Sequence, residues 1–245
     1  MFNTRVNFTT NGSLHAGHIC MAMVNEYEAH STGGLFLVRF EDNSPQWTAR
    51  QQPGEALGYA AQMQADLEFM GIDVDGYSYQ SEMERDVATV LNSMRFLRRQ
   101  LYISPVGVSQ ACAPEVPTDP GNQYPFAPLL TREKVILDHM QDINLLIRGF
   151  DLLGEYSFYT FLCDLWEISI PRQIFLPRLQ MSEGEAFNTP VDVSKSSARC
   201  KIADLRKSFT AWGLREILAL AYLKDPAGPW LASNVKANPV LRGVA

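Results

Sequence analysis

Cysteine is scarce in this chain, and the few cysteines present do not cluster. Cys20, Cys112, Cys163 and Cys200 lie far apart in the sequence and form no CxxC pair. A zinc site and a disulfide framework therefore have no support from the sequence. Reduced thiols, which are typical of a cytoplasmic protein, are the default expectation.

Long apolar runs and an excess of positive charge are also missing. No apolar stretch approaches the length of a membrane span, and no signal peptide precedes the first expected strand. The formal net charge of -6 gives the chain no general attraction for phosphate backbones, although a local basic surface can still bind RNA. We expect a cytoplasmic protein without membrane contact; its oligomeric state is left open, with a monomer favoured.

The 245 residues, 46% of them hydrophobic, fit one large α/β domain with an insertion or a small appendage. Short apolar runs predict strands at 5–8, 35–40, 134–138, 143–148 and 173–176, and helical spacing predicts helices at 54–70, 82–101, 152–165, 201–209 and 214–223. A turn and a short extended segment are expected at 71–76, and a loop at 181–190. This alternation predicts a doubly wound parallel sheet of the Rossmann type.

Composition divides the chain into four segments. Residues 1–102 form the first half of the expected core, and residues 103–128, which are rich in proline and small residues, read as a short insertion. Residues 129–200 form the second half of the core. Residues 201–245 form a C-terminal helical segment with an irregular tail.

The strongest functional signal lies in residues 5–18, RVNFTTNGSLHAGH. They predict a strand, a tight polar turn and a helix that begins near His15. His15 and His18 are three residues apart and share a face on the first turn, where unpaired amides and the helix dipole favour anions. Two imidazole donors there suit a triphosphate, and Gly17, which has no Cβ, would let an adenine lie close to the backbone. The alternative is that both histidines merely cap and pack.

A second signal is the apolar run at 35–40, which ends in Glu41 and Asp42. It predicts a buried parallel strand with carboxylates at its C-terminal end, where open α/β sheets bind their ligands. The alternative for both carboxylates is to cap a following helix, and for Asp42 we favour the cap.

Four ordered segments carry a family resemblance: residues 5–17, the run GGLFLVRFEDNS at 33–44, LIRGFD at 146–151 and DVSKS at 192–196. They are similar to the RFAPSPTGxLHxG, GGxFxLRIEDTD, VIRGED and KMSKS segments of class I aminoacyl-tRNA synthetases. The chain resembles the catalytic core of the glutamyl branch and of its short glutamyl-Q relative, without the anticodon-binding region. The resemblance extends from Arg5 to about residue 225 and implies a Rossmann-type catalytic domain split by an acceptor-binding insertion.

The resemblance implies ATP-dependent activation of an amino acid as its adenylate, with Mg²⁺ accompanying ATP and no zinc. It implies transfer to a tRNA or to a smaller acceptor. The implied catalytic residues are His15, His18 and Lys195; the implied ATP contacts are His15, Gly17, His18, Asp151, Ser194, Lys195 and Ser196; the implied amino-acid contacts are Arg5, Thr9, Glu41, Leu130 and Arg148. For Arg5 and Arg148 the alternative is a structural ion pair.

Departures from the family pattern concern the substrate. Leu130 stands where the family has a tyrosine, and Lys134 stands where it has an asparagine. Loss of the phenol removes a hydrogen-bond donor from a site built for a carboxylate, so the implied acidic substrate, glutamate, loses a contact. Ser44 and Asp192 also replace family residues. Two other functions stay open: nucleotidyl transfer to a small metabolite, and RNA binding by a catalytically silent paralogue.

Overall fold

A computed structural model describes residues 1–43, 54–97, 103–104, 107–108, 127–176, 180–182, 190–192 and 201–223. Its centre is a five-stranded parallel sheet with the order β3-β2-β1-β6-β7. The strands are β1 (Thr4–Thr9), β2 (Phe36–Glu41), β3 (Gly76–Tyr79), β6 (Leu145–Gly149) and β7 (Arg172–Leu176). The expectation of a parallel α/β sheet is confirmed.

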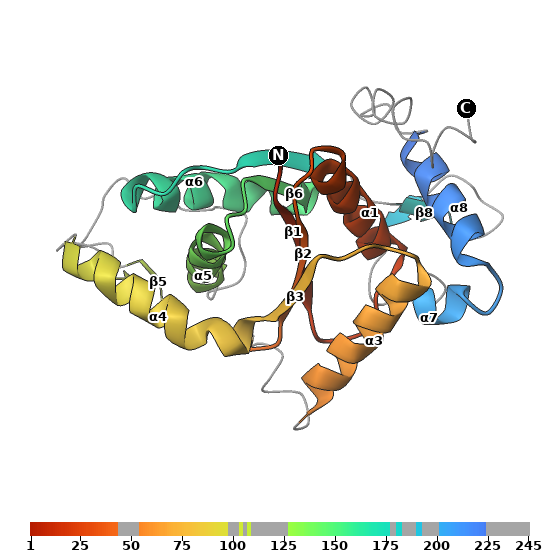
Figure 1. Ribbon diagram of the computed structural model, residues 1–245, viewed down its shortest axis with the longest axis horizontal. Helices are drawn as coiled ribbons and strands as arrows, with labels where there is room; N and C mark the ends of the chain where they lie inside the picture. The colour runs from red at the N-terminus through yellow and green to blue at the C-terminus, as the bar shows by residue number, and fades with distance from the viewer. Residues whose placement is uncertain are drawn as a thin grey trace.

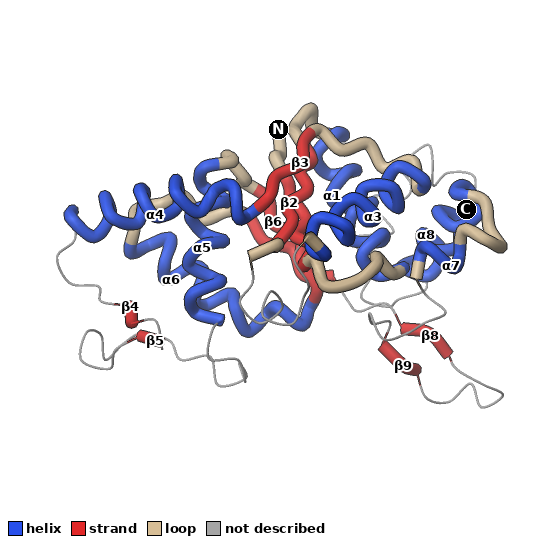
Figure 2. The backbone as a smooth tube through the Cα atoms, turned by 90° about the horizontal axis from the view of Figure 1, so that it is seen from below, coloured by secondary structure: helices blue, strands red, loops and turns tan. Residues whose placement is uncertain are grey.

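Helices cover both faces of this sheet (Figures 1 and 2). One side carries α1 (Ala16–Ser31), α3 (Glu55–Phe69), α7 (Ile202–Leu205) and α8 (Ala211–Leu223), and the other carries α4 (Gln80–Leu97), α5 (Ala127–Met140) and α6 (Tyr156–Leu165). A 3-10 helix, η1 (Phe150–Glu155), leads into α6. Two short antiparallel pairs lie apart from the sheet: β4 (Ile103–Ser104) with β5 (Gly107–Val108), and β8 (Gln180–Ser182) with β9 (Pro190–Asp192).

Each face of the sheet has its own apolar core because successive strand side chains point to opposite sides. Phe36, Val38 and Phe40 of β2 join the core formed with α1 and α3. The intervening Leu37 packs with the core formed by α5 and α6. Arg39, on that same second face, is completely buried. A buried arginine in a central strand needs buried anionic partners, and these lie on α5.

The strand order reverses between β1 and β6, which makes this the switch point of the sheet. Thr4 opposite Leu145 is the one residue pair that joins the two strands. Toward their carboxyl ends, β1 and β6 form no further backbone pair with each other within the described strands. Open α/β sheets bind ligands at such a point, beyond the carboxyl ends of the strands.

Several expectations from the sequence were wrong. Residues 134–138 belong to helix α5, not to a strand, and residues 150–155 form a 3-10 turn before α6. The run Val135-Ile136-Leu137 is fully buried, and a short buried apolar run does not distinguish a strand from one face of a helix. A turn and a short extended segment were expected at residues 71–76, but strand β3 begins only at Gly76. The expected loop at 181–190 contributes to β8 and β9.

Other expectations fall on residues outside the described part of the chain. These are Ser44, Ser194, Lys195, Ser196, most of the insertion at 103–128 and the tail from Asp225. Within the described residues, no helix has the length and apolar character needed to cross a membrane.

Candidate active site

The two histidines of the HAGH motif lie where β1 passes into α1. His15 is the N-cap residue of α1, with an extended backbone. Its amide donates to Nδ1 of His18 over 3.3 Å, and the two imidazole rings stack with centroids 3.7 Å apart. The edge of the Phe8 ring also meets His18, at 5.4 Å between centroids. The expectation that the two imidazoles share a face is confirmed.

The chain returns to this motif from far along the sequence. The amide of Ile202 donates to the carbonyl of Leu14 over 3.1 Å, and Lys201 forms an antiparallel bridge with His15. Lys201 is the first described residue after the SKS segment that contains Lys195. The described chain therefore resumes, six residues after Lys195, directly beside the HAGH motif. Sequence reasoning did not anticipate this contact.

A buried ion cluster, centred on Asp138 of α5, lies on the face of the sheet that α5 covers (Figure 1). Arg5 donates through Nε and Nη2 to the two carboxylate oxygens, each over 2.8 Å, and Arg39 donates through Nη2 over 2.9 Å. The hydroxyl of Tyr159 donates to the same carboxylate over 2.9 Å. Burial alone would raise the pKa of Asp138, but the two guanidinium groups lower it far below its usual range. For Arg5 the structure thus shows the structural ion pair given above as the alternative.

Arg148, near the end of β6, is in a different state. Its side chain is only 3% exposed, yet none of its three nitrogens has a hydrogen-bond partner among the described residues. It makes one long ion pair, 3.8 Å from Nη1 to Oε2 of Glu155, and its guanidinium carbon lies 4.6 Å from the ring centroid of Tyr159. Burial and the neighbouring Arg5 lower the pKa of Arg148. Buried donors without acceptors are costly, and a bidentate carboxylate is the acceptor that this group suits best.

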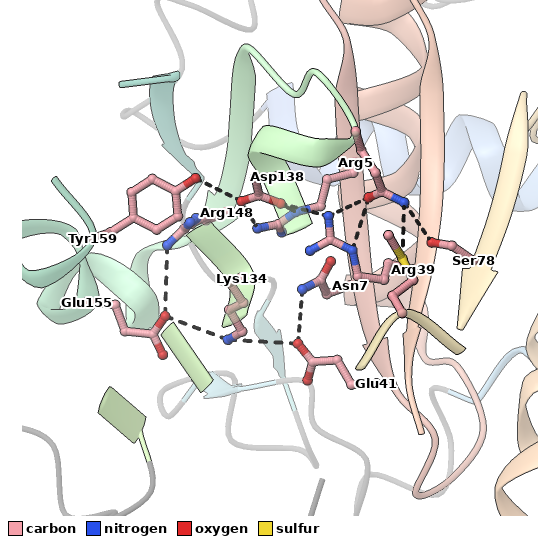
Figure 3. Close-up of polar contacts among 12 residues, drawn as sticks. Arg5, Asn7, Arg39, Glu41, Ser78, Lys134, Asp138, Arg148, Glu155 and Tyr159 are labelled. Atoms are coloured by element: carbon pink, nitrogen blue, oxygen red, sulfur yellow. Dashed lines mark hydrogen bonds and ion pairs between the residues drawn. The ribbon is translucent and has the colours of Figure 1, made fainter. Parts of the chain in front are cut away.

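Glu41, at the end of β2, is held by polar neighbours from strand β1 and helix α5. It accepts hydrogen bonds of 3.0 Å each from Nδ2 of Asn7 and from the hydroxyl of Thr9. Lys134 Nζ of α5 lies 3.8 Å from Oε1 of Glu41 and 3.7 Å from Oε2 of Glu155. Burial alone would raise the pKa of Glu41, but Lys134, Asn7 and Thr9 outweigh it and lower the pKa. Figure 3 shows the resulting chain of charges from Glu41 through Lys134 and Glu155 to Arg148.

Asp42 does not join these charges. Its carboxylate accepts from the amide of Ser81 over 2.9 Å and also from the Ser81 hydroxyl. Ser81 lies in the first turn of α4, so Asp42 caps α4 and not α3, the next described helix in the sequence, which was expected to be capped.

The structure brings several expected site residues together and leaves others undescribed. Thr9, Glu41 and Arg148 lie at or near the carboxyl ends of β1, β2 and β6, whereas Arg5 lies near the start of β1. His15, Gly17 and His18 lie at the start of α1. Leu130 lies on α5 and Asp151 on η1, but their side chains are outside the described part.

Sequence reasoning missed Asp138, Glu155 and Tyr159 as members of this site. It also named Lys134 only as a departure from the family. A signal was present: Lys134, Asp138 and Gln141 follow one another at spacings of four and three, which places them on one helix face. The wrong assignment of residues 134–138 to a strand concealed that pattern.

The charges of the buried cluster do not cancel. Four cationic side chains face three carboxylates; the cations are Arg5, Arg39, Lys134 and Arg148, and the anions are Glu41, Asp138 and Glu155. Among these described side chains one positive charge is left over, and all three nitrogens of Arg148 lack hydrogen-bond partners among the described residues. One anion bound at Arg148 would balance the charge of these seven side chains.

Comparison with known proteins finds a family match for the first part of the chain. Residues 1–95 match the family model of class I tRNA synthetases (E and Q), catalytic domain. This first part of the chain is similar to the class I synthetases. The matched residues include the HAGH motif and Glu41, whereas Arg148 and Lys195 lie beyond them.

Individual relatives are distant and matched only in part. A glutamyl-Q tRNA(Asp) synthetase of Prochlorococcus marinus is 34% identical over 65 residues, which are 26% of this chain and 19% of that protein. A glutamate–tRNA ligase of Dinoroseobacter shibae is 30% identical over 95 residues, which are 39% of this chain and 20% of the ligase. The matches thus span about a fifth of each curated relative.

The fold similarity covers more of the chain than the sequence similarity. The glutamate-tRNA synthetase structure of Elizabethkingia anophelis superposes with a TM-score of 0.58 at 17% identity. That match covers 85% of this chain and 54% of the synthetase. At this identity it shows that the two proteins share the class I catalytic fold.

Proposed function

We propose that this chain activates a carboxylic acid with ATP, forming an acyl-adenylate, and then transfers the acyl group to an acceptor. In its named relatives the acid is glutamate and the acceptor is a tRNA. Glutamate is therefore the first acid to test, with a tRNA or a smaller nucleophile as acceptor. The observation that carries the proposal is the buried guanidinium of Arg148, whose donors have no hydrogen-bond acceptor among the described residues.

The chemistry needs one displacement at phosphorus. An oxygen of the acid's carboxylate attacks the α-phosphorus of ATP, the bond to the bridging oxygen breaks, and pyrophosphate leaves. Mg²⁺ accompanying ATP would offset the negative charge of the phosphates. An acceptor hydroxyl or amine then attacks the acyl carbon, and AMP leaves. Such reactions depend on in-line positioning and on stabilisation of developing charge rather than on a strong acid or base.

His15 and His18 are the residues we assign to the triphosphate. Their stacked rings lie at the start of α1, where the helix dipole favours anions. Imidazole donors in that position would bind the phosphate oxygens and stabilise the pentavalent transition state. Gly17 and Asp151 are assigned to the remainder of the nucleotide by their places in the family motifs.

Lys195, with Ser194 and Ser196, is assigned to the leaving pyrophosphate. This assignment rests on the SKS segment of the sequence and on the position of Lys201 beside His15. A lysine ammonium is a compact charge that suits a phosphate group.

A second candidate function is RNA binding without catalysis. Two residues expected to contact the substrate already have partners within the protein. The guanidinium of Arg5 binds Asp138, and the carboxylate of Glu41 lies beside Lys134, which favours this alternative. Under this alternative, removing ATP or Mg²⁺ would leave RNA affinity unchanged.

The test is ATP–pyrophosphate exchange with each common amino acid and with related acids lacking the amino group, with and without bulk tRNA. Exchange that depends on one acid supports the proposal and names the substrate. Exchange that appears only with tRNA supports the proposal with an RNA acceptor. No exchange under any condition would overturn it and leave the RNA-binding alternative.

A further inference from the structure

The ammonium of Lys134 lies between two carboxylates at the centre of the site. Its distances are 3.8 Å to Glu41 and 3.7 Å to Glu155, and its side chain is 13% exposed (Figure 3). Both distances are longer than a hydrogen bond, so Lys134 balances the two charges without filling the hydrogen-bonding capacity of either group. The protein thus supplies its own ammonium to this pair of anions.

Glu41 is prepared for a cation by its surroundings. The amide of Asn7 and the hydroxyl of Thr9 orient its two oxygens, and its lowered pKa keeps it ionised near neutral pH. A carboxylate held in this way is the natural partner for an ammonium. Here the ammonium next to it comes from α5, so a ligand does not need to bring one.

The hydrogen-bond donors that still need an acceptor lie on the other side of Glu155, on Arg148. Its three nitrogens lack hydrogen-bond partners among the described residues, and the seven charged side chains counted above carry one excess positive charge. A single bound carboxylate would accept hydrogen bonds from Arg148 and would also neutralise the excess positive charge. An ammonium on the next carbon would instead enter a region that already holds Lys134, and like charges at close range disfavour binding.

We propose that the site accepts a carboxylic acid without an ammonium group next to the carboxylate, and that Lys134 is the residue that sets this specificity. The acid's carboxylate binds Arg148, and the Lys134 ammonium takes the place beside Glu41 and Glu155 that a substrate amine would need. This inference rests on the proposed activation function and names its substrate class.

Matched pairs of acids test the proposal on the full chain. The pairs are glutamine with glutaramate, valine with isovalerate, and glutamate with glutarate; in each pair the second acid lacks the amino group. Binding is measured by calorimetry and activation by ATP–pyrophosphate exchange. We expect at least one amine-free acid to bind about tenfold or more tightly than its partner, which is the effect expected of one like-charge contact.

Substitutions at Lys134 make the test specific. Lys134→Gln removes the internal ammonium, so the amine-bearing acid of the preferred pair should gain affinity relative to its partner. Lys134→Arg keeps the cation and should keep the amine-free preference. Lys207→Gln is the matched control, since Lys207 is exposed and pairs only with Asp204 among the described residues. If Lys134→Gln does not fold, the preference of the wild-type chain and that of Lys134→Arg decide whether the inference holds.

The outcomes separate this inference from the function on which it rests. If the wild-type chain binds and exchanges an amino acid at least as well as its amine-free partner, the inference is wrong and the activation function stands. The same holds if Lys134→Gln leaves the preference unchanged. If no acid of any pair binds or supports exchange, both proposals are wrong.

Discussion

The guanidinium of Arg5 and the carboxylate of Asp138 meet through two hydrogen bonds of 2.8 Å each, joining the first strand to helix α5 across 133 residues of sequence. Arg39 shares the same carboxylate. Asp138 is 1% exposed and is therefore the counter-charge that permits two arginines to lie in the second core.

Asp138→Asn should consequently destabilise the fold strongly. The substitution keeps the shape of the side chain but leaves Arg5 and Arg39 buried without a full counter-charge. We expect a loss of about 3–5 kcal/mol in the free energy of unfolding, measured by urea denaturation. Asp204→Asn is the control, because Asp204 makes an exposed pair with Lys207, and it should change little. Equal small losses in both variants would contradict the central role of Asp138.

The same carboxylate should make the fold sensitive to acid. The folded-state pKa of Asp138 lies below its unfolded value, so its contribution is present above the unfolded pKa of about 3.9 and is lost as the pH falls through the folded value. The pKa of Glu41 is also lowered in the folded state. Unfolding free energy measured from pH 7 to below pH 4 should fall steeply in the wild type. The fall should be smaller in Asp138→Asn; identical slopes would show that Asp138 does not govern it.

Strands β1, β2, β6 and β7 and the HAGH turn were predictable because their signals are local. The site, in contrast, depends on helix α5, whose sequence pattern is ambiguous. Buried Val135, Ile136 and Leu137 resemble a strand when they are considered alone. The assignment of Lys134 and Asp138 to the site depends on their lying on one face of a helix packed against β1 and β2. That relation is set by tertiary contacts, which single-sequence patterns do not contain.

Arg148→Met should separate function from stability. Arg148 is buried with unpaired donors, so an unbranched apolar side chain should leave the unfolding free energy unchanged or raise it by about 1–3 kcal/mol. Acid-dependent exchange should be lost because the carboxylate loses its partner. Arg172→Met, at the exposed start of β7, is the control for removal of an arginine and should retain exchange. Strong destabilisation by Arg148→Met would show that Arg148 is a structural residue.

The turn between α1 and β2 offers a test of packing that does not involve the site. A Cβ added at Gly34 would lie 1.9 Å from the carbonyl oxygen of Phe2, whereas one added at Gly12 meets nothing within 4 Å. Gly34→Ala should therefore force the N-terminal segment away from α1 and cost about 1–3 kcal/mol of unfolding free energy. Gly12→Ala should be nearly neutral. Calorimetric melting of the two variants compares them directly.

His18→Ala tests the assignment of the HAGH motif to the triphosphate. It removes the ring that stacks on His15 and accepts the His15 amide, so the first turn of α1 loses both an imidazole donor and an ordering contact. If His18 stabilises charge on the reacting phosphate, the exchange rate should fall by about 10²–10³-fold while the affinity for the acid stays the same.

His30→Ala is the matched control for His18→Ala. His30 lies on the same helix but in its last turn, where it pairs with Asp75 over 2.8 Å, away from the candidate site. It should keep full exchange activity. A fall in exchange of similar size in both variants would mean that the integrity of α1 matters and not the imidazole of His18. A fall in acid affinity with unchanged turnover would instead move His18 from the nucleotide to the acid.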